Sequence, residues 1–163
     1  MMLFLFPAVF LAGVAAVLGF LGYGIQTLVR HGVRRSGAVP VLRAGAAFAG
    51  AVATAVYLWG TLYVAGAVLE AEDGGAGSAP LPPCRIAGRE EEVGHVIDYT
   101  VDFVPLRFFC ETSDGGGYAT HDVPGYVNPA AASLALTAAS LAIAAGFASE
   151  RRARTDAGRR RMR

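Results

Sequence analysis

The sequence predicts an α-helical integral membrane protein with three transmembrane helices and a small extracytoplasmic antiparallel β-module of about three or four strands. Three stretches, residues 1–29, 44–69 and 123–149, contain no Asp, Glu, Lys or Arg, and each exceeds the roughly 20 residues that cross about 30 Å of hydrocarbon. The charges between them are sorted by sign. Residues 30–43 carry four arginines and no acid, residues 70–122 eleven acids and three arginines, and residues 150–163 seven arginines and two acids. Insertion under the positive-inside rule produces this segregation, whereas a soluble fold has no reason for it.

The first apolar stretch, residues 1–29, predicts a retained transmembrane helix rather than a cleaved signal peptide. A signal peptide has a basic start and a short apolar core. This stretch has no positive charge near its start, and its apolar run continues past Gly19 to Ile25. Its basic flank, residues 30–43, follows it, so we expect the N-terminus outside and this loop in the cytoplasm.

The other two apolar stretches complete one consistent topology. Their backbone amides must be paired internally within hydrocarbon, so both are expected to be helical. The helix over 44–69 leads outward, residues 70–128 lie outside, and the helix over 129–149 returns to a cytoplasmic tail at 150–163. All 14 basic residues are arginine, which indicates the codon bias of a high-GC genome. We therefore expect a multi-pass protein of a bacterial plasma membrane.

The acidic segment is expected to contain a flexible Gly/Pro-rich linker over 70–83 and a folded module over 84–128. Residues 93–104 alternate as a half-buried strand does, with Ile97, Tyr99, Val101 and Phe103 on one face. Residues 106–112 resume the alternation, and 113–117 form a turn signal before a short strand at 118–122. A first strand is expected near residues 84–87. So small a sheet needs additional stabilisation.

The two cysteines, Cys84 and Cys110, both lie in this module. An oxidising exterior and an even count favour a disulfide between them. On the chain-entropy model it would stabilise the fold by about 3.5 kcal/mol. A redox role would favour a Cys-x-x-Cys spacing at a helix start, which the sequence lacks.

The module contains residue types that can bind a metal, but their spacing along the strand argues against a metal site. Imidazole and carboxylate groups together bind transition metals, and the module contains His95, Asp98, Asp102, His121 and Asp122. In a regular strand, however, His95 points away from the face of Asp98 and Asp102. We also find no nucleophile, phosphate-binding or dinucleotide motif. The sequence therefore predicts no metal, no cofactor and no enzymatic activity.

The arginines outside the module are expected to determine topology and to contact lipid headgroups, at about 1 kcal/mol each near an anionic surface. Tethered beside a membrane, they do not predict a nucleic-acid site. They are Arg30, Arg34, Arg35, Arg43, Arg151, Arg152, Arg154, Arg159, Arg160, Arg161 and Arg163.

Residues near the ends of the apolar stretches predict how the module is connected to the helices and where the outer membrane interface lies. Asn128 is a favourable N-cap and Pro129 suits a first helical position, so we expect the module to connect rigidly to the third helix and loosely to the second. Trp59, Tyr63 and Tyr126 are expected at the outer interface, where aromatic belts lie.

The leading functional hypothesis is a non-enzymatic accessory or interaction subunit of a membrane or envelope assembly. Its partners are the lipid bilayer and another envelope protein or further copies of the chain. The alternative is a subunit of an oligomeric transporter or channel that uses Thr54 or Thr137, although no ionisable residue lies within a span. An extracytoplasmic thiol oxidoreductase is a weaker hypothesis.

Overall fold

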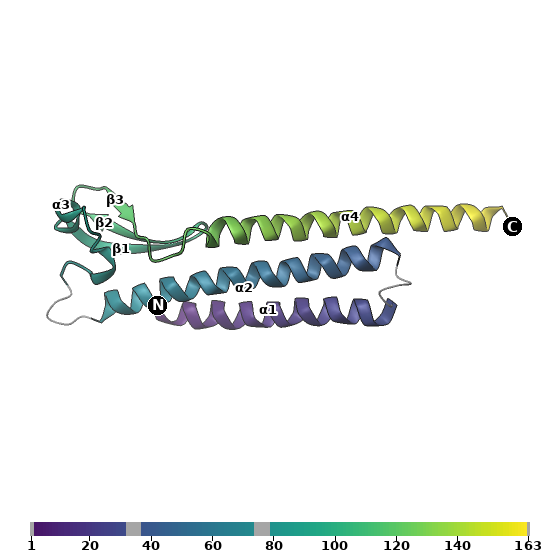
Figure 1. Cartoon of the computed structure of the whole chain (residues 1–163), viewed down its shortest axis with the longest axis horizontal. Coiled ribbons are helices and arrows are strands. Elements are labelled where there is room, and N and C mark those ends of the chain that lie inside the picture. Colours follow the sequence, from purple (N-terminus) through teal and green to yellow (C-terminus); the bar gives the residue numbers. More distant parts are fainter. Residues whose placement is uncertain (1, 32–36, 74–78, 163) are drawn as a thin grey trace. The chain divides into compact units, whose positions relative to one another are not determined.

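The computed structural model describes residues 2–31, 37–73 and 79–162. Its long helices are α1 (Met2–His31), α2 (Ala38–Glu72) and α4 (Val127–Arg161) (Figure 1). Each contains a span that is long and apolar enough to cross a membrane, with mean hydropathies of 2.1, 1.6 and 1.8. The three helices expected from the sequence are therefore present.

The chain divides into two compact units. The sheet unit comprises residues 1–10 and 56–129, and the helix unit comprises residues 11–55 and 130–163. All three long helices pass from one unit into the other. The first residues of α1 and α4 and the last part of α2 belong to the sheet unit.

Several hydroxyl side chains of the long helices bond to the helix that carries them. Thr54 Oγ1 donates to the Gly50 carbonyl at 2.9 Å, and Thr137 Oγ1 donates to the Ser133 carbonyl at 2.8 Å. This i to i−4 bonding removes the cost of placing a hydroxyl in an apolar environment. The two threonines considered for a transport path thus already have backbone partners.

Aromatic rings pack on glycines where α1 and α2 meet in the helix unit. A Cβ atom on Gly24 would lie 3.1 Å from Phe48 Cζ, and one on Gly50 would lie 3.6 Å from the Phe20 ring. Small residues let a neighbouring helix approach closely. Gly50, one of the small residues at four-residue spacing in the sequence, therefore serves a helix contact.

Two of the helices are much longer than a membrane span. Helices α2 and α4 each contain 35 residues, which corresponds to about 52 Å at 1.5 Å per residue. Helix α2 continues three residues into the expected linker, and α4 continues through most of the expected tail. Residues 74–78 of the linker lie outside the described residues.

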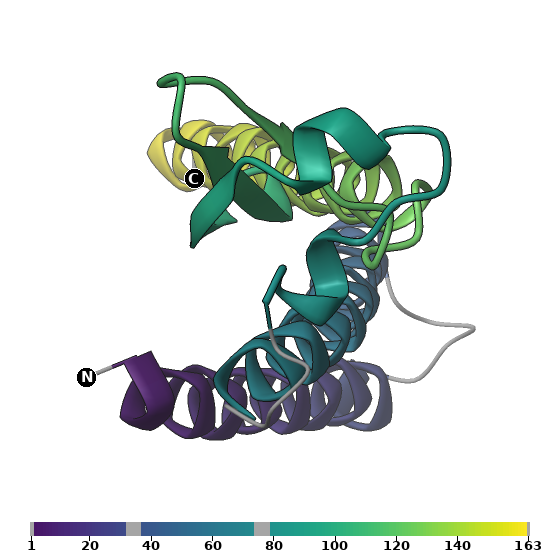
Figure 2. The same cartoon turned by 90° about the vertical axis from the view of Figure 1, so that its left-hand side faces the viewer.

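The sheet is antiparallel, with strands β1 (Val96–Phe103), β2 (Leu106–Thr112) and β3 (Gly117–Ala119) in the order β1-β2-β3 (Figure 2). The strand expected near residues 84–87 is wrong. A 3-10 turn, η1 (Pro82–Cys84), ends where that strand was expected to begin, and residues 85–87 form no strand. Prolines at 82 and 83 favour the turn, because proline fixes φ and has no N–H to donate to a ladder. One helical turn, α3 (Glu90–Val93), follows. The elements η1, α3, β1, β2 and β3 are called the sheet module below.

The turn between β2 and β3 is the one that the sequence predicts. Asp114 Oδ1 accepts hydrogen bonds from Thr112 Oγ1 at 2.5 Å and from the Gly116 amide at 3.2 Å. Gly115 has a φ of +80°, a conformation that favours glycine. These hydrogen bonds hold the pKa of Asp114 below its usual value.

Alternation along β1 and β2 follows the expected pattern except at one position. Leu106, Phe108 and Cys110 are fully buried, and Val101 is 7% exposed. Ile97 was expected on the same face but is 67% exposed. The pairing with β2 shifts between Val96 and Asp98, and such a bulge leaves the extra residue out of the alternation.

The sheet module packs its buried face on α2. Four residues of α2 at helical spacing enter the same apolar cluster as Val101, Phe108 and the two cysteines: Val64, Ala67, Val68 and Ala71. Their i, i+3, i+4, i+7 spacing places them on one helix face. The expectation of a loose connection to the second helix is therefore wrong, because α2 supplies four of the ten buried residues of this cluster.

Gly60 of α2 lies where the first residues of β2 and α4 meet this helix. A Cβ atom there would lie 2.6 Å from Val127 Cγ1 and 2.8 Å from Leu106 Cδ2. Leu106 and Val127 are both 0% exposed. The contact is possible only because residue 60 has no side chain.

We expect Gly60→Ala to destabilise the sheet module, because overpacking costs about 1–3 kcal/mol and exceeds the ~1 kcal/mol that alanine gains over glycine in a helix. Gly66→Ala on the same helix is the matched control, since its Cβ would meet nothing within 4 Å. Thermal unfolding in detergent, followed by near-ultraviolet circular dichroism, compares the two. Equal or greater stability of Gly60→Ala would contradict the close contact.

Candidate functional site

The disulfide joins η1 to the middle of β2. Cys84 and Cys110 are bonded with their Cα atoms 6.0 Å apart, and both residues are 0% exposed. Tyr118 of β3 donates its hydroxyl to the Cys84 carbonyl at 2.5 Å. Burial raises the pKa of Tyr118. A disulfide enclosed in an apolar core is a structural link in this geometry, since thiol exchange requires access to the sulfur atoms.

Asn128 binds the first residue of β2 through its side-chain amide. Its Oδ1 accepts from the Leu106 amide and its Nδ2 donates to the Leu106 carbonyl, both at 2.9 Å. The side chain expected to cap the third helix is therefore used to hold the start of β2. The expectation that the module connects rigidly to the third helix at this residue agrees with the observed bonds.

Two other helices hold the same end of the β1–β2 hairpin. The Tyr57 hydroxyl of α2 donates to the Phe103 carbonyl at 2.7 Å, and the Phe6 ring of α1 lies 6.2 Å from the Phe103 ring. Phe103 ends β1, so this hairpin end contacts α1, α2 and α4 within the sheet unit. At its tip, Val104 is 91% exposed.

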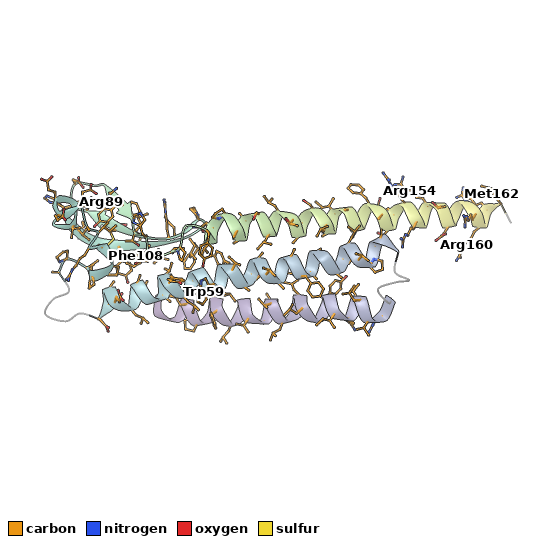
Figure 3. The ribbon with its side chains drawn as sticks, in the orientation of Figure 1. Trp59, Arg89, Phe108, Arg154, Arg160 and Met162 are labelled. Carbon is orange, nitrogen blue, oxygen red and sulfur yellow. A yellow bond between two sulfur atoms is a disulfide. The ribbon has the colours of Figure 1, made fainter. Side chains whose placement is uncertain are left out.

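Exposed aromatic side chains lie in the parts of α2 and of the segment before α4 that are close in sequence to the residues holding the hairpin end. Trp59 and Tyr63 form an edge-to-face pair with centroids 5.6 Å apart, and both are exposed on α2. Figure 3 labels Trp59 on this helix. Tyr126, immediately before α4, is 58% exposed. Amphipathic rings of this kind are typical of a membrane interface.

The far part of the module is tied to the last turn of α2. Tyr99 stacks on Phe108 with ring centroids 4.9 Å apart, and its hydroxyl donates to Glu72 Oε1 at 2.6 Å. Burial and the Glu72 carboxylate raise the pKa of Tyr99 to about 12. The neutral phenol is thus the form that this contact requires.

The sheet face that points away from α2 is polar and largely acidic. Asp102 pairs with Arg107 at 2.6 Å, and Arg107 lies over the Phe109 ring. Asp98 stands opposite Glu111, which places two carboxyl groups on neighbouring strands. β1 is also an edge strand. Exposed apolar residues lie near its start, at Ile97, and directly after its last residue, at Val104. This combination is typical of a surface that binds another protein.

The residues weighed as metal ligands do not come together. Within residues 2–31, 37–73 and 79–162, no group of three His, Cys, Asp or Glu side chains is placed to hold a metal ion. The parity argument that separated His95 from Asp98 and Asp102 remains the reason to set a metal site aside.

Three of the arginines that the sequence assigned to topology converge in the helix unit. Arg30 near the end of α1, Arg43 near the start of α2, and Arg152 of α4 line one cavity of about 470 Å³. The sequence identified these residues but not their convergence, because it does not show which helix faces meet. Arg34, Arg35 and Arg163 lie outside the described residues.

The remaining arginines follow one another along the last turns of α4. Arg154 lies 3.8 Å from Glu150 in an exposed i, i+4 pair. Arg154 and Arg160 extend from α4 in different directions (Figure 3). The other members of this group are also exposed: Arg151, Arg159 and Arg161.

No protein-family model, no curated protein and no solved structure matches the chain.

We expect Asn128→Ala to destabilise the sheet module by about 2 kcal/mol, because it leaves the amide and carbonyl of the buried Leu106 without their partner. Ser133→Ala on the same helix is the control, since the exposed Ser133 hydroxyl bonds only to its own helix. Unfolding in detergent and hydrogen exchange at the Leu106 amide measure the effect. Unchanged exchange at Leu106 would contradict this role of Asn128.

We expect stability to fall as pH rises from about 10 towards 12, because the folded state retains a Tyr99 proton that an unfolded tyrosine releases near pH 10. Because the pKa of Tyr99 is raised to about 12 in the folded state, its contribution to stability is fully present below pH 10 and is lost as the pH rises from about 10 to about 12. Unfolding midpoints measured across this pH range test the effect. Tyr99→Phe should reduce the loss, and an identical pH profile in that variant would contradict the assignment.

Proposed function

We propose that this chain is a non-enzymatic integral membrane protein of a bacterial plasma membrane that presents the sheet module on the extracytoplasmic side. There it acts as an accessory or interaction subunit of a membrane or envelope assembly. The observation that carries the proposal is that α2 completes the core of the module. A surface fixed to a transmembrane helix is held at a defined height and orientation, which suits recognition of a neighbouring membrane protein.

The contacts of the sheet unit support one position for the outer membrane boundary. Phe6, Tyr57 and Asn128 contact the same hairpin end from three helices, and exposed aromatic rings lie close to it in sequence. From Arg43 to Gly60, α2 advances 17 residues, about 26 Å. We therefore assign α2 to the membrane between Arg43 and Gly60, and its remaining residues to the module.

Charge supports the orientation. The arginines that precede α2 and follow the apolar part of α4 favour the cytoplasm, while the acidic module is the part that translocates. The same orientation places Cys84 and Cys110 in an oxidising compartment, where a disulfide persists. Helix contacts, charge and thiol chemistry thus support the same topology.

The β1 edge is the surface that we assign to the partner. It carries Ile97 at 67% exposure and Val104 at 91%. Asp98 and Asp102 lie between them, which suits a partner that offers cationic side chains flanked by apolar residues. Because Val104 lies at the level of the interfacial aromatics, we expect the partner to be membrane-embedded.

A photocrosslinking residue at position 97 should capture one discrete protein in intact cells, because Ile97 projects from the proposed surface. The matched control is position 143, an isoleucine of α4 in the helix unit that is similarly exposed, at 60%. Crosslinked products are separated by mass and identified. The same crosslinked products from both positions, or no product from position 97, would contradict the assignment of the β1 edge to a protein partner.

Orientation is checked in the same cells. A membrane-impermeant maleimide should label Ser113→Cys, in the exposed turn before β3, without permeabilisation. It should label Thr155→Cys, near the end of α4, only after permeabilisation. The reverse labelling would contradict the topology.

A further inference from the structure

We propose that the helix unit contains a binding site for one anionic phospholipid, with the phosphate among Arg30, Arg43 and Arg152 and an acyl chain in the adjoining groove. This inference rests on the membrane insertion proposed above. It adds a defined ligand site to the general contact between arginines and headgroups.

The headgroup cavity is formed by all three long helices. It encloses about 470 Å³. Helix α1 contributes Tyr23, Gln26, Thr27 and Arg30, α2 contributes Val39, Pro40 and Arg43, and α4 contributes Ser149 and Arg152. Hydroxyl, amide and guanidinium groups therefore face the same space, as recognition of a phosphate and its polar substituent requires.

Acidic groups are few around this cavity. The sequence contains no Asp or Glu before Glu70. On α4, Glu150 pairs with Arg154, and Asp156 follows Arg152 by one turn. Among the described ion pairs, none includes Arg30, Arg43 or Arg152. Three guanidinium groups of like charge around one cavity favour a bound anion.

Two backbone features add to this preference. Val39 belongs to the first turn of α2, where N–H groups lack helical partners and the helix dipole is positive; Pro40 beside it has no N–H to offer. Arg152 lies directly on Gly37, where an added Cβ would come within 2.8 Å of Arg152 Cζ. The absence of a side chain at residue 37 thus lets Arg152 of α4 reach the start of α2.

An apolar groove adjoins the headgroup cavity. It encloses about 480 Å³ and shares Tyr23 and Arg43 with that cavity. Its other lining residues are Phe20 and a set of small residues from α2 and α4: Ala46, Ala47, Gly50, Ala138, Ala139, Ala142, Ala145 and Gly146. From residue 138 to 146, α4 advances about 12 Å. An acyl chain can lie in this groove because the short side chains of alanine and glycine do not fill it.

The headgroup cavity and the apolar groove together favour a phospholipid over other ligands. A soluble phosphate would use the arginines and leave the groove empty. A second parallel copy of this chain would fill the groove but would bring its own arginines to the same level, where like charges repel. An anionic phospholipid supplies the negative charge and the apolar chain together, and basic pockets between membrane helices bind such headgroups.

The test uses the full chain in detergent and measures retention of dioleoylphosphatidylglycerol, dioleoylphosphatidylcholine and glycerol phosphate by native mass spectrometry. We expect phosphatidylglycerol to bind most tightly. Arg43→Gln with Arg152→Gln should weaken that binding about 30-fold, from roughly fivefold for each arginine. The matched control, Arg151→Gln with Arg161→Gln, removes the same charge outside the cavity and should change binding less than threefold.

A second pair of variants tests the groove without changing charge. Ala142→Phe fills it and should reduce phosphatidylglycerol binding at least tenfold. Ala144→Phe adds the same ring to α4 at a position that does not line the groove, and should retain binding. Circular dichroism and elution volume confirm that each variant is folded.

The results of these binding measurements distinguish a phospholipid from a soluble anion and from a second copy of the chain. Equal retention of phosphatidylcholine, or equal losses in both arginine pairs, would overturn the site. Binding of glycerol phosphate that is as tight as that of the lipid would assign the cavity to a soluble anion. Conversion of a dimer to a monomer by Ala142→Phe would assign the groove to a second copy. Alkaline carbonate extraction is the separate check on membrane insertion, since protein released by it would contradict the proposed function itself.

Discussion

The buried face of a three-stranded sheet needs an apolar partner, and the structure meets that need with the last part of α2. A sheet of this size is marginal in water because it exposes nearly as much apolar surface as it buries. Val64, Ala67, Val68 and Ala71 cover it. The module is therefore packed onto a long apolar helix rather than folded as a separate domain on a linker.

That arrangement explains why the contacts differ between the two ends of the module. At the hairpin end, beside the start of α4, Gly60 allows close approach and Asn128 and Tyr57 bind strand backbone. Away from that end, the Cys84–Cys110 bond links η1 to the middle of β2, and the Tyr99–Glu72 hydrogen bond holds β1 to the last turn of α2. The disulfide thus adds a covalent link within the core that α2 covers.

The sequence predicts the elements whose signals are local. Alternation identified β1 and β2, Gly115 and its neighbours identified the turn, and segregated charge identified the helices. The prediction that Ile97 lies on the buried face was wrong, because a bulge depends on how the strand pairs with its neighbour. Residues 64–71 could not be assigned to the module because apolar residues that face lipid and those that face protein have the same composition. The convergence of Arg30, Arg43 and Arg152 likewise depends on which helix faces meet.

The distribution of burial along the helices bears on the kind of function. In the most apolar window of α2, 39% of residues are buried, compared with 6% in α1 and 11% in α4. Helix α2 is therefore the one that the chain itself packs around. Most residues in the apolar windows of α1 and α4 are not buried by the chain. A self-contained transporter would need a closed bundle around a polar path, yet Thr54 and Thr137 bond to their own helices. The apolar surface that α1 and α4 leave exposed is better suited to association with lipid or another protein than to enclosing a path for a solute.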